Sequence, residues 1–202
     1  MNRRVLLLAP LLALLGCSAP KVPDFTYFRL PRPPTVEPLA MPLFDQPVVV
    51  QAFGADGLYA DQALVYALDA EGQQLRQYHY QLWTDSPTRL LQRRLIAELR
   101  EWRVAARVTD ELPASHPAIR VRGMILRFDR VPVGGGWHAV VGLKLRADAP
   151  DGAPLVDDYY RAERATGGAT LAATMDAYGA ALDEVFATFR ADVAKAGAAR
   201  HE

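Results

Sequence analysis

The sequence predicts a single domain of the α/β (α+β) class, in which a mixed, mostly antiparallel sheet carries two main helices. Strand-like and helix-like segments follow one another in the order strand, hairpin, helix, three-stranded meander, helix. Such an order folds into a layer of strands covered by helices. The chain has 202 residues, a length that one hydrophobic core can serve, and no repeat of solenoid length divides it.

The first strands are short and are separated by a proline-rich stretch. Residues Tyr27–Leu30 and Pro47–Phe53 have the apolar character of strands. Between them, residues 31–47 hold six of the fifteen prolines. Because proline lacks a backbone donor and has a fixed φ, neither a helix nor a central strand can pass through this stretch. We expect an extended surface segment.

A hairpin is predicted next. Residues Ala63–Leu68 and Leu75–Trp83 flank a polar loop that ends in Gly72, a residue suited to a hairpin connection. Side chains alternate between the two faces of a strand, so Tyr78 and Tyr80 should lie on the same face of the second arm. One face of the hairpin is therefore expected to be aromatic.

A helix should follow the hairpin. Ser86 is expected to cap it through its side chain, and Pro87 suits its first turn. The apolar stripe recurs at three- and four-residue steps, in Leu91, Leu95, Leu99 and Trp102, whereas Arg89, Arg93, Arg100 and Arg103 should face solvent. Residues Val104–Val108 then predict another strand.

The last part of the chain predicts an antiparallel meander and a long helix. The strands are Ile119–Val131, Trp137–Ala147 and Asp158–Ala165, joined by glycine-containing turns. In the final helix, apolar residues recur with helical spacing from Leu171 to Val193. Thr170 is expected to cap it, Gly197 to end it, and residues 198–202 to form a flexible tail.

The N-terminus has the pattern of a secretory leader. Two arginines precede an apolar run that is too short to span a bilayer and that stops at Gly16-Cys17. The sequence Leu14-Leu15-Gly16-Cys17 resembles the bacterial lipobox, although Leu15 stands where a smaller residue is usual. We expect residues 1–16 to be removed, Cys17 to carry acyl chains such as palmitate, and residues 17–24 to form a tether. An ordinary signal peptide that ends near a cysteine is the alternative.

Charge and cysteine content narrow the function classes. The formal net charge is zero, and loss of Arg3 and Arg4 with the leader leaves −2, so no nucleic-acid partner is expected. Cys17 is the only cysteine, which excludes an intramolecular disulfide and a thiolate zinc site. Residues His79, His116 and His138 are scattered over separate segments, so neither a metal site nor a cofactor is expected.

Enzyme motifs are missing from the sequence. It has no nucleophile elbow, no paired-histidine zinc motif and no phosphate loop, so we do not expect an enzyme. The glycines at 134–136 lack the lysine and helix of a phosphate loop and indicate a hairpin turn. The adjacent Asp157 and Asp158 point to opposite faces of a strand, so they cannot act as a catalytic pair, and we expect a strand entrance there.

Several segments resemble the ABC-type transport auxiliary lipoprotein family. The resemblance rests on the lipobox followed by Tyr27-Phe28-Arg29-Leu30, on the aromatic hairpin, and on Trp83-Thr84-Asp85-Ser86-Pro87 leading into a leucine-rich helix. Ser86-Pro87 departs from the two prolines of many relatives, and Ala67 stands where they often have arginine. The resemblance implies a fold similar to the amino-terminal domain of TolB.

The resemblance also implies a function. Family members serve MCE-type lipid transport systems, so the chain would be an outer-membrane lipoprotein on the periplasmic face, docked to a periplasmic MCE protein of an ABC-type or Pqi-like transporter. Ser18 after the cysteine agrees with the outer membrane. A homo-oligomeric ring could match the symmetry of the partner. The alternative is a lipid-anchored scaffold or binding module of another system, such as lipopolysaccharide assembly or a TolB-like assembly.

Four aromatic residues are the candidate partner-binding residues. Tyrosine and tryptophan offer large, rigid contact areas with a polar tip, and the hairpin region contains Tyr66, Tyr78, Tyr80 and Trp83. The same residues could instead be core residues beneath a helix. The sequence leaves both interpretations open, together with a lipid-facing role for this surface.

Overall fold

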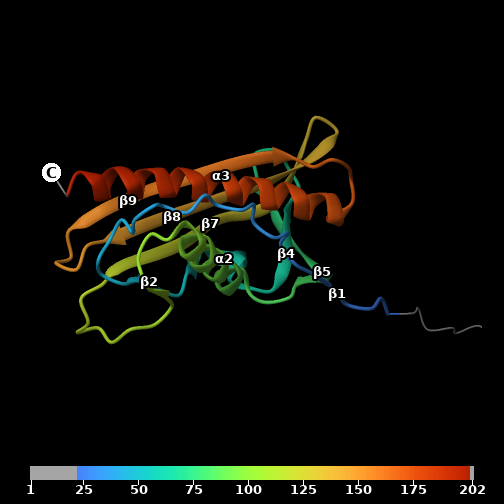
Figure 1. Ribbon diagram of the computed structural model, residues 1–202. Helices are drawn as coiled ribbons and strands as arrows, with labels where there is room; N and C mark the ends of the chain where they lie inside the picture. Colours follow the sequence, from blue (N-terminus) through green and yellow to red (C-terminus); the bar gives the residue numbers. More distant parts are fainter. Residues whose placement is uncertain (1–21, 201–202) are drawn as a thin grey trace, which may run out of the picture.

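The computed structural model describes residues 22–200 and contains one nine-stranded sheet (Figure 1). Strand β7 (Ile119–Val133) organises the sheet, because strands pair along both of its edges. Along one edge runs β8 (Gly136–Asp148), antiparallel to it. Along the other edge lie β2 (Val48–Val50), β3 (Gly54–Ala55) and β4 (Ala63–Ala67), each parallel to it.

Four more strands extend this arrangement. Strand β9 (Pro154–Ala165) is antiparallel to β8, and β5 (Leu75–Trp83) is antiparallel to β4. Strands β1 (Thr26–Phe28) and β6 (Val108–Thr109) pair in parallel with β5 and β2. The long ladders are antiparallel and the parallel ladders are short, so the predicted mixed, mostly antiparallel sheet is confirmed.

The predicted hairpin turn between β7 and β8 is also present. Only Gly134 and Gly135 separate the two strands, and their φ angles are 57° and 80°. Two consecutive positive φ values define the tight turn that suits the twist of a hairpin. These glycines therefore serve chain reversal.

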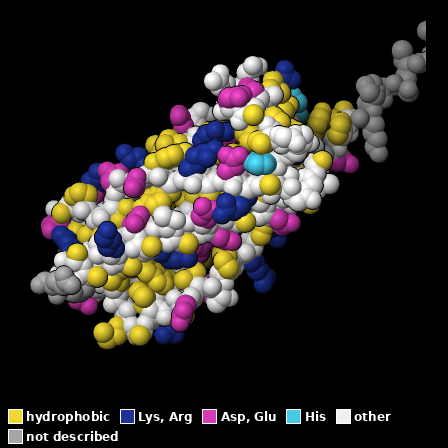
Figure 2. All heavy atoms as spheres, turned by 90° about the horizontal axis from the view of Figure 1, so that it is seen from above, with side chains coloured by type: hydrophobic (Ala, Val, Ile, Leu, Met, Phe, Trp, Pro, Cys, Tyr) yellow, Lys and Arg dark blue, Asp and Glu magenta, His cyan; other side chains and the backbone are white. Residues whose placement is uncertain are grey.

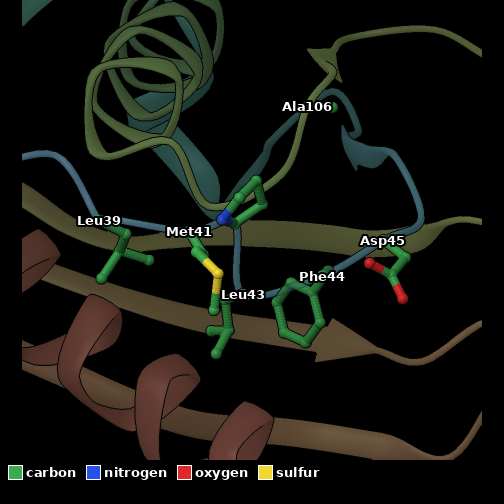
Figure 3. Close-up of a pocket in the computed structure, with 7 residues that line it drawn as sticks. Leu39, Met41, Leu43, Phe44, Asp45 and Ala106 are labelled. Carbon is green, nitrogen blue, oxygen red and sulfur yellow. The ribbon is translucent and has the colours of Figure 1, made fainter.

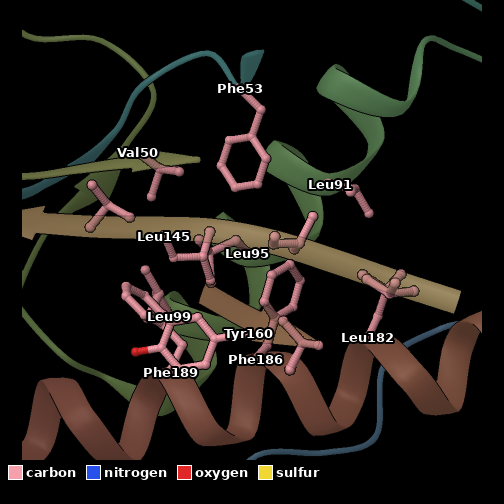
Figure 4. Packing of buried hydrophobic residues seen from close by; sticks show 14 of the residues in the cluster. Val50, Phe53, Leu91, Leu95, Leu99, Leu145, Tyr160, Leu182, Phe186 and Phe189 are labelled. Carbon is pink, nitrogen blue, oxygen red and sulfur yellow. The ribbon is translucent and has the colours of Figure 1, made fainter. Parts of the chain in front are cut away.

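Two helices pack side by side on the sheet. Helix α3 (Leu171–Ala198) lies along β8 and β9, and α2 (Pro87–Trp102) lies beside it, with the 3-10 turn η2 (Gly57–Ala60) nearby (Figure 1). Their apolar stripes point into one core (Figure 4). The buried members labelled there include Leu91, Leu95, Leu99, Leu145, Leu182, Phe186 and Phe189. The helical periodicity of the sequence thus identified the core faces correctly.

The strand predicted at residues 104–108 is wrong for most of its length. Strand β6 holds only Val108–Thr109, and the preceding backbone pairs with the proline-rich segment. The carbonyl of Val104 accepts from the amides of Leu43 and Phe44 at 2.9 and 3.0 Å, and the carbonyl of Trp102 accepts from Leu39 at 2.9 Å. These hydrogen bonds take the place of a regular ladder.

The proline-rich segment is extended, as predicted, but it is also part of the packing. Its first residues lie against α3, where a β-carbon on Gly179 would come within 3.1 Å of the Pro31 ring. Further along, Leu43 fills the space above Gly197, where a β-carbon would lie 2.6 Å from the leucine Cγ. The segment therefore follows α3 for most of its length.

Of the three predicted helix-end residues, Thr170 behaves as predicted, whereas Gly197 and Ser86 do not. Gly197 does not end α3, which continues to Ala198, because Gly197 lacks the positive φ of a helix-ending glycine. Its missing side chain instead makes room for Leu43. The predicted tail therefore begins within the helix. The Ser86 side chain makes no cap, since its hydroxyl hydrogen-bonds to that of Thr88 at 2.9 Å. The hydroxyl of Thr170 does accept from the Ala173 amide at 3.2 Å, as predicted.

A buried ionic network joins the two helices and the proline-rich segment. Arg94 and Glu98 of α2 are only 6% and 1% exposed, and Arg94 Nε donates to Glu98 Oε1 at 3.2 Å. Arg94 also binds Asp183 of α3 and the carbonyl of Pro31, the latter at 2.9 Å. Glu98 accepts from Arg190 of α3. Burial raises the pKa of the Glu98 carboxyl, and the two guanidinium groups oppose this shift.

Removal of the charge at Glu98 should destabilise the domain strongly. We expect Glu98→Gln to lower the free energy of unfolding by about 3 kcal/mol, because it leaves the buried Arg94 and the half-buried Arg190 without their shared carboxylate. The control, Glu101→Gln, changes an exposed residue of the same helix and should cost less than about 0.5 kcal/mol. Urea denaturation measures both values, and equal midpoints would contradict a stabilising role for the network.

Candidate docking surface

The structure places the four predicted aromatic residues in three different environments. Trp83 is 1% exposed and stacks on Phe128, with ring centroids 5.1 Å apart. Tyr178 of α3 meets the same indole edge-on at 5.5 Å. Trp83 is therefore a core residue that fastens β5 beneath α3, and it has no surface to offer a partner.

Tyr66 and Tyr78 form a pair on the β4–β5 hairpin. Both are half-buried, and their ring centroids are 4.5 Å apart. The Tyr78 hydroxyl accepts a hydrogen bond from Nη1 of Arg130 at 3.2 Å. The pair thus presents a rigid, partly exposed aromatic surface, which we call the hairpin tyrosine pair.

Tyr80 lies apart from this pair. Its ring packs against Phe25, just before β1, at a centroid distance of 5.6 Å. The separation follows from an irregularity in the hairpin, where Ala63 pairs with Leu82 but Val65 pairs with Gln77. The extra residues in β5 interrupt the simple alternation on which the expected single aromatic face depended.

The buried Arg130 holds the hairpin tyrosine pair in place through its hydrogen bond to Tyr78. The residue is 3% exposed, its guanidinium carbon lies 3.9 Å from the centroid of the Trp137 ring, and Nη2 donates to the Ala169 carbonyl at 3.1 Å. Its Nε makes no hydrogen bond within the described residues. Sequence reasoning missed this residue because an arginine in a strand is normally counted as exposed.

A second buried charge lies next to Arg130 in the sequence. Asp129 is fully buried and accepts from the Tyr59 hydroxyl at 3.0 Å, from Arg127 Nε at 2.9 Å and from Arg127 Nη2 at 2.6 Å. Burial raises the pKa of Tyr59, and the negative charge of Asp129 raises it further. Tyr59 therefore remains a donor, and both carboxylate oxygens are occupied. This arrangement binds β7 to η2 and offers no reactive group.

The outer face of the meander carries a hollow of about 590 Å³ lined in part by Arg122, Met124, Lys144 and Arg146. Its cations are already paired with carboxylates. Arg122 and Arg146 bind Asp148, while Lys144 and Arg146 bind Asp157. Burial would raise the pKa of Asp148, but hydrogen bonds from the two arginines outweigh it and lower that pKa.

Asp157 and Asp158 do not mark the start of a strand. They lie inside β9, which begins at Pro154, four residues before the predicted start at Asp158.

An apolar hollow of about 580 Å³ opens along the proline-rich segment (Figure 3). Leu39, Met41, Leu43 and Phe44 line it, and the Met41 side chain is 78% exposed. Asp45 is the one charged residue among its lining residues. The hollow therefore lacks the converging polar groups of a catalytic site.

The histidines lie on separate elements. Nδ1 of His138, on β8, lies 2.8 Å from Oε1 of Glu163, on β9. His79 belongs to β5, and His116 belongs to the loop before β7. Within residues 22–200, no three metal-binding side chains come together. In the same range, no helix is both long and apolar enough to cross a membrane.

Comparison with known protein families shows which family the chain belongs to. The family described as the ABC-type transport auxiliary lipoprotein component matches residues 34–189. The chain belongs to this family. It is therefore a lipoprotein component of an ABC-type transport system, which implies partnership with other transporter components and association with a membrane. The family is a transport auxiliary family and not an enzyme family.

Solved structures show the same fold. A Xanthomonas campestris protein of the DUF330 family is 16% identical, with a TM-score of 0.74 over 87% of this chain and 99% of that one. An uncharacterized protein is 14% identical, with a TM-score of 0.64 over 86% of this chain and 98% of that one. A hypothetical protein of Chlamydia trachomatis is 9% identical, with a TM-score of 0.54 over 77% of this chain and 99% of that one. None of the curated proteins matches the sequence.

The support of the hairpin tyrosine pair can be tested by removing one hydroxyl. Tyr78→Phe should lower the free energy of unfolding by about 1–3 kcal/mol, because a second donor of the buried Arg130 then loses its acceptor. Tyr66→Phe is the matched control, since the Tyr66 hydroxyl makes no hydrogen bond within the described chain. Equilibrium urea unfolding compares the two variants. Equal losses would show that the bond to Arg130 contributes nothing.

Proposed function

We propose that this chain is an outer-membrane lipoprotein on the periplasmic face that anchors and docks the periplasmic MCE protein of an ABC-type, Pqi-like lipid transport system. The family match over residues 34–189 carries the proposal, together with the lipobox-like ending at Cys17. The chain itself performs no chemistry. It supplies a fixed position and an interface, and several copies arranged in a ring would match the symmetry of the partner.

The anchor would be the acylated Cys17. This residue and the leader, 1–16, lie outside the described residues. Each buried methylene of an acyl chain contributes roughly 0.8 kcal/mol, so the two or three chains of a bacterial lipoprotein hold it permanently. Ser18 supports an outer-membrane position, because the residue after the cysteine influences sorting.

The interface would include the hairpin tyrosine pair. Tyr66 and Tyr78 are half-buried, their rings pack against each other, and Arg130 donates to the Tyr78 hydroxyl, so little side-chain entropy is lost when a partner covers them. Tyrosines of this kind are common at the centres of protein interfaces. Because Trp83 is buried, the proposed docking role rests on Tyr66 and Tyr78.

Loss of the anchoring thiol should release the protein from the membrane. We expect Cys17→Ala to move the chain from the membrane pellet to the soluble fraction, because no acyl chain can be attached to alanine. Ultracentrifugal fractionation followed by immunoblotting measures the distribution, with Ser18→Ala as the control that keeps the thiol. Unchanged membrane attachment of Cys17→Ala would contradict the lipid anchor.

Docking should be visible in co-purification. The detergent-solubilised protein is expected to recover an MCE-domain protein, and Tyr66→Ala should reduce that recovery several-fold by removing contact area. The control, Tyr159→Ala, removes a 45% exposed tyrosine from the outer face of β9 and should leave recovery unchanged. Recovery of a different envelope complex without any MCE protein would favour the alternative role as a scaffold of another system.

A further inference from the structure

Exposed apolar side chains gather where the described chain begins. Val22, Phe25 and Tyr27 are 70%, 59% and 58% exposed. They are three of the seven large hydrophobic residues that are exposed within residues 22–200, although they occupy only residues 22–27. Figure 2 shows hydrophobic side chains at this end of the molecule. Such a concentration on an otherwise mixed surface indicates a contact with something apolar.

Phe25 and Tyr27 form one edge of the sheet with Tyr80. Phe25 packs on the Tyr80 ring at 5.6 Å, and Tyr27 in β1 pairs with Leu82 in β5. Phe28, the next residue, packs against the core, so Tyr27 is turned outward. Strand β1 is the last strand on its side of the sheet. We call Phe25, Tyr27 and Tyr80 the aromatic edge.

The position of the tether brings a membrane to this edge. Val22 comes five positions after Cys17 in the sequence and Phe25 comes eight positions after it. Even a fully extended chain therefore spans at most about 18 Å to Val22 and about 29 Å to Phe25. The headgroup region of one leaflet is itself roughly 5–7 Å thick. Once Cys17 is acylated, the aromatic edge cannot leave the neighbourhood of the bilayer.

We propose that the aromatic edge rests in the lipid headgroup layer and forms a second attachment beside the acyl chains. This inference rests on the proposed anchoring function. Tyrosine and other aromatic rings favour the membrane interface, where the ring is in apolar surroundings and the polar tip is hydrated. In Figure 1 the C-terminal end of α3 lies at the opposite end of the molecule from β1. The contact therefore directs the C-terminal end of α3 away from the membrane.

A protein strand is a poorer occupant of this edge. Strand β1 has only three residues, and Pro23 and Pro31 lie close to its two ends. Each proline lacks the amide that a longer ladder would need, and short edges of this kind resist the addition of another strand. The side chains, and not the backbone, are thus the part of β1 that is available for contact.

Tryptophan quenching in vesicles tests the proposal. The acylated full-length product is reconstituted into vesicles of phosphatidylethanolamine and phosphatidylglycerol, with and without bromine on the acyl chains near the headgroup. Phe25→Trp and Tyr27→Trp each place a reporter on the aromatic edge, and Tyr159→Trp places one on an exposed tyrosine of β9. Subtraction of the parent protein removes the emission of the three native tryptophans. We expect bromine to quench the reporters at 25 and 27 several-fold more than the reporter at 159.

Flotation of the vesicles separates the two hypotheses. A protein that does not float with the vesicles contradicts the lipid anchor itself. A protein that floats but shows equal quenching at positions 25 and 159 overturns the second attachment and leaves the anchor intact. A blue-shifted reporter at 25 that bromine does not quench would show that protein, from a partner or a second copy, covers the edge, and it would also overturn the proposal.

Discussion

The buried ionic network around Arg94 and Glu98 is the interaction on which the arrangement of the domain depends. It joins α2 to α3 through Asp183 and Arg190, and it holds the start of the proline-rich segment through the Pro31 carbonyl. Charges withdrawn from water are tolerated only when each is paired, so the two helices are restricted to one register. Because the proline-rich segment lies along α3, it is part of the core packing and is not a free arm.

This domain carries two aromatic surfaces of different character on the neighbouring strands β1, β5 and β4. The aromatic edge at β1 lies close to the tether, whereas the hairpin tyrosine pair lies on β4 and β5 and is supported by the buried Arg130. An anchored adaptor needs such a division, because one contact must face the membrane while another remains open to a partner. In the proposed function the domain contributes position and contact area, and its buried charges serve stability.

The sequence predicted those elements whose burial follows a regular period. The hairpin, the meander and both helices were recognised because apolar residues recur at two-residue or three- to four-residue steps over long stretches. Residues 104–107 were misassigned because their backbone carbonyls accept from the distant residues Leu43, Phe44 and Val48, which no local pattern reveals. Arg94, Glu98 and Arg130 were missed for a related reason, since a charge can be buried only when partners from other elements surround it.

By itself the sequence determined the fold class, the family resemblance and the lipobox-like cysteine, because each of these is written in consecutive residues or in a short repeating pattern. Only the tertiary structure decided which aromatic residues are available for contact. Trp83 lies in the core, Tyr66 and Tyr78 pack against each other, and Tyr80 packs against Phe25. The physical reason is that the exposure of a side chain depends on strand register and on packing between distant segments. The irregular pairing of β4 with β5 alters the register, and with it the neighbours of each aromatic side chain.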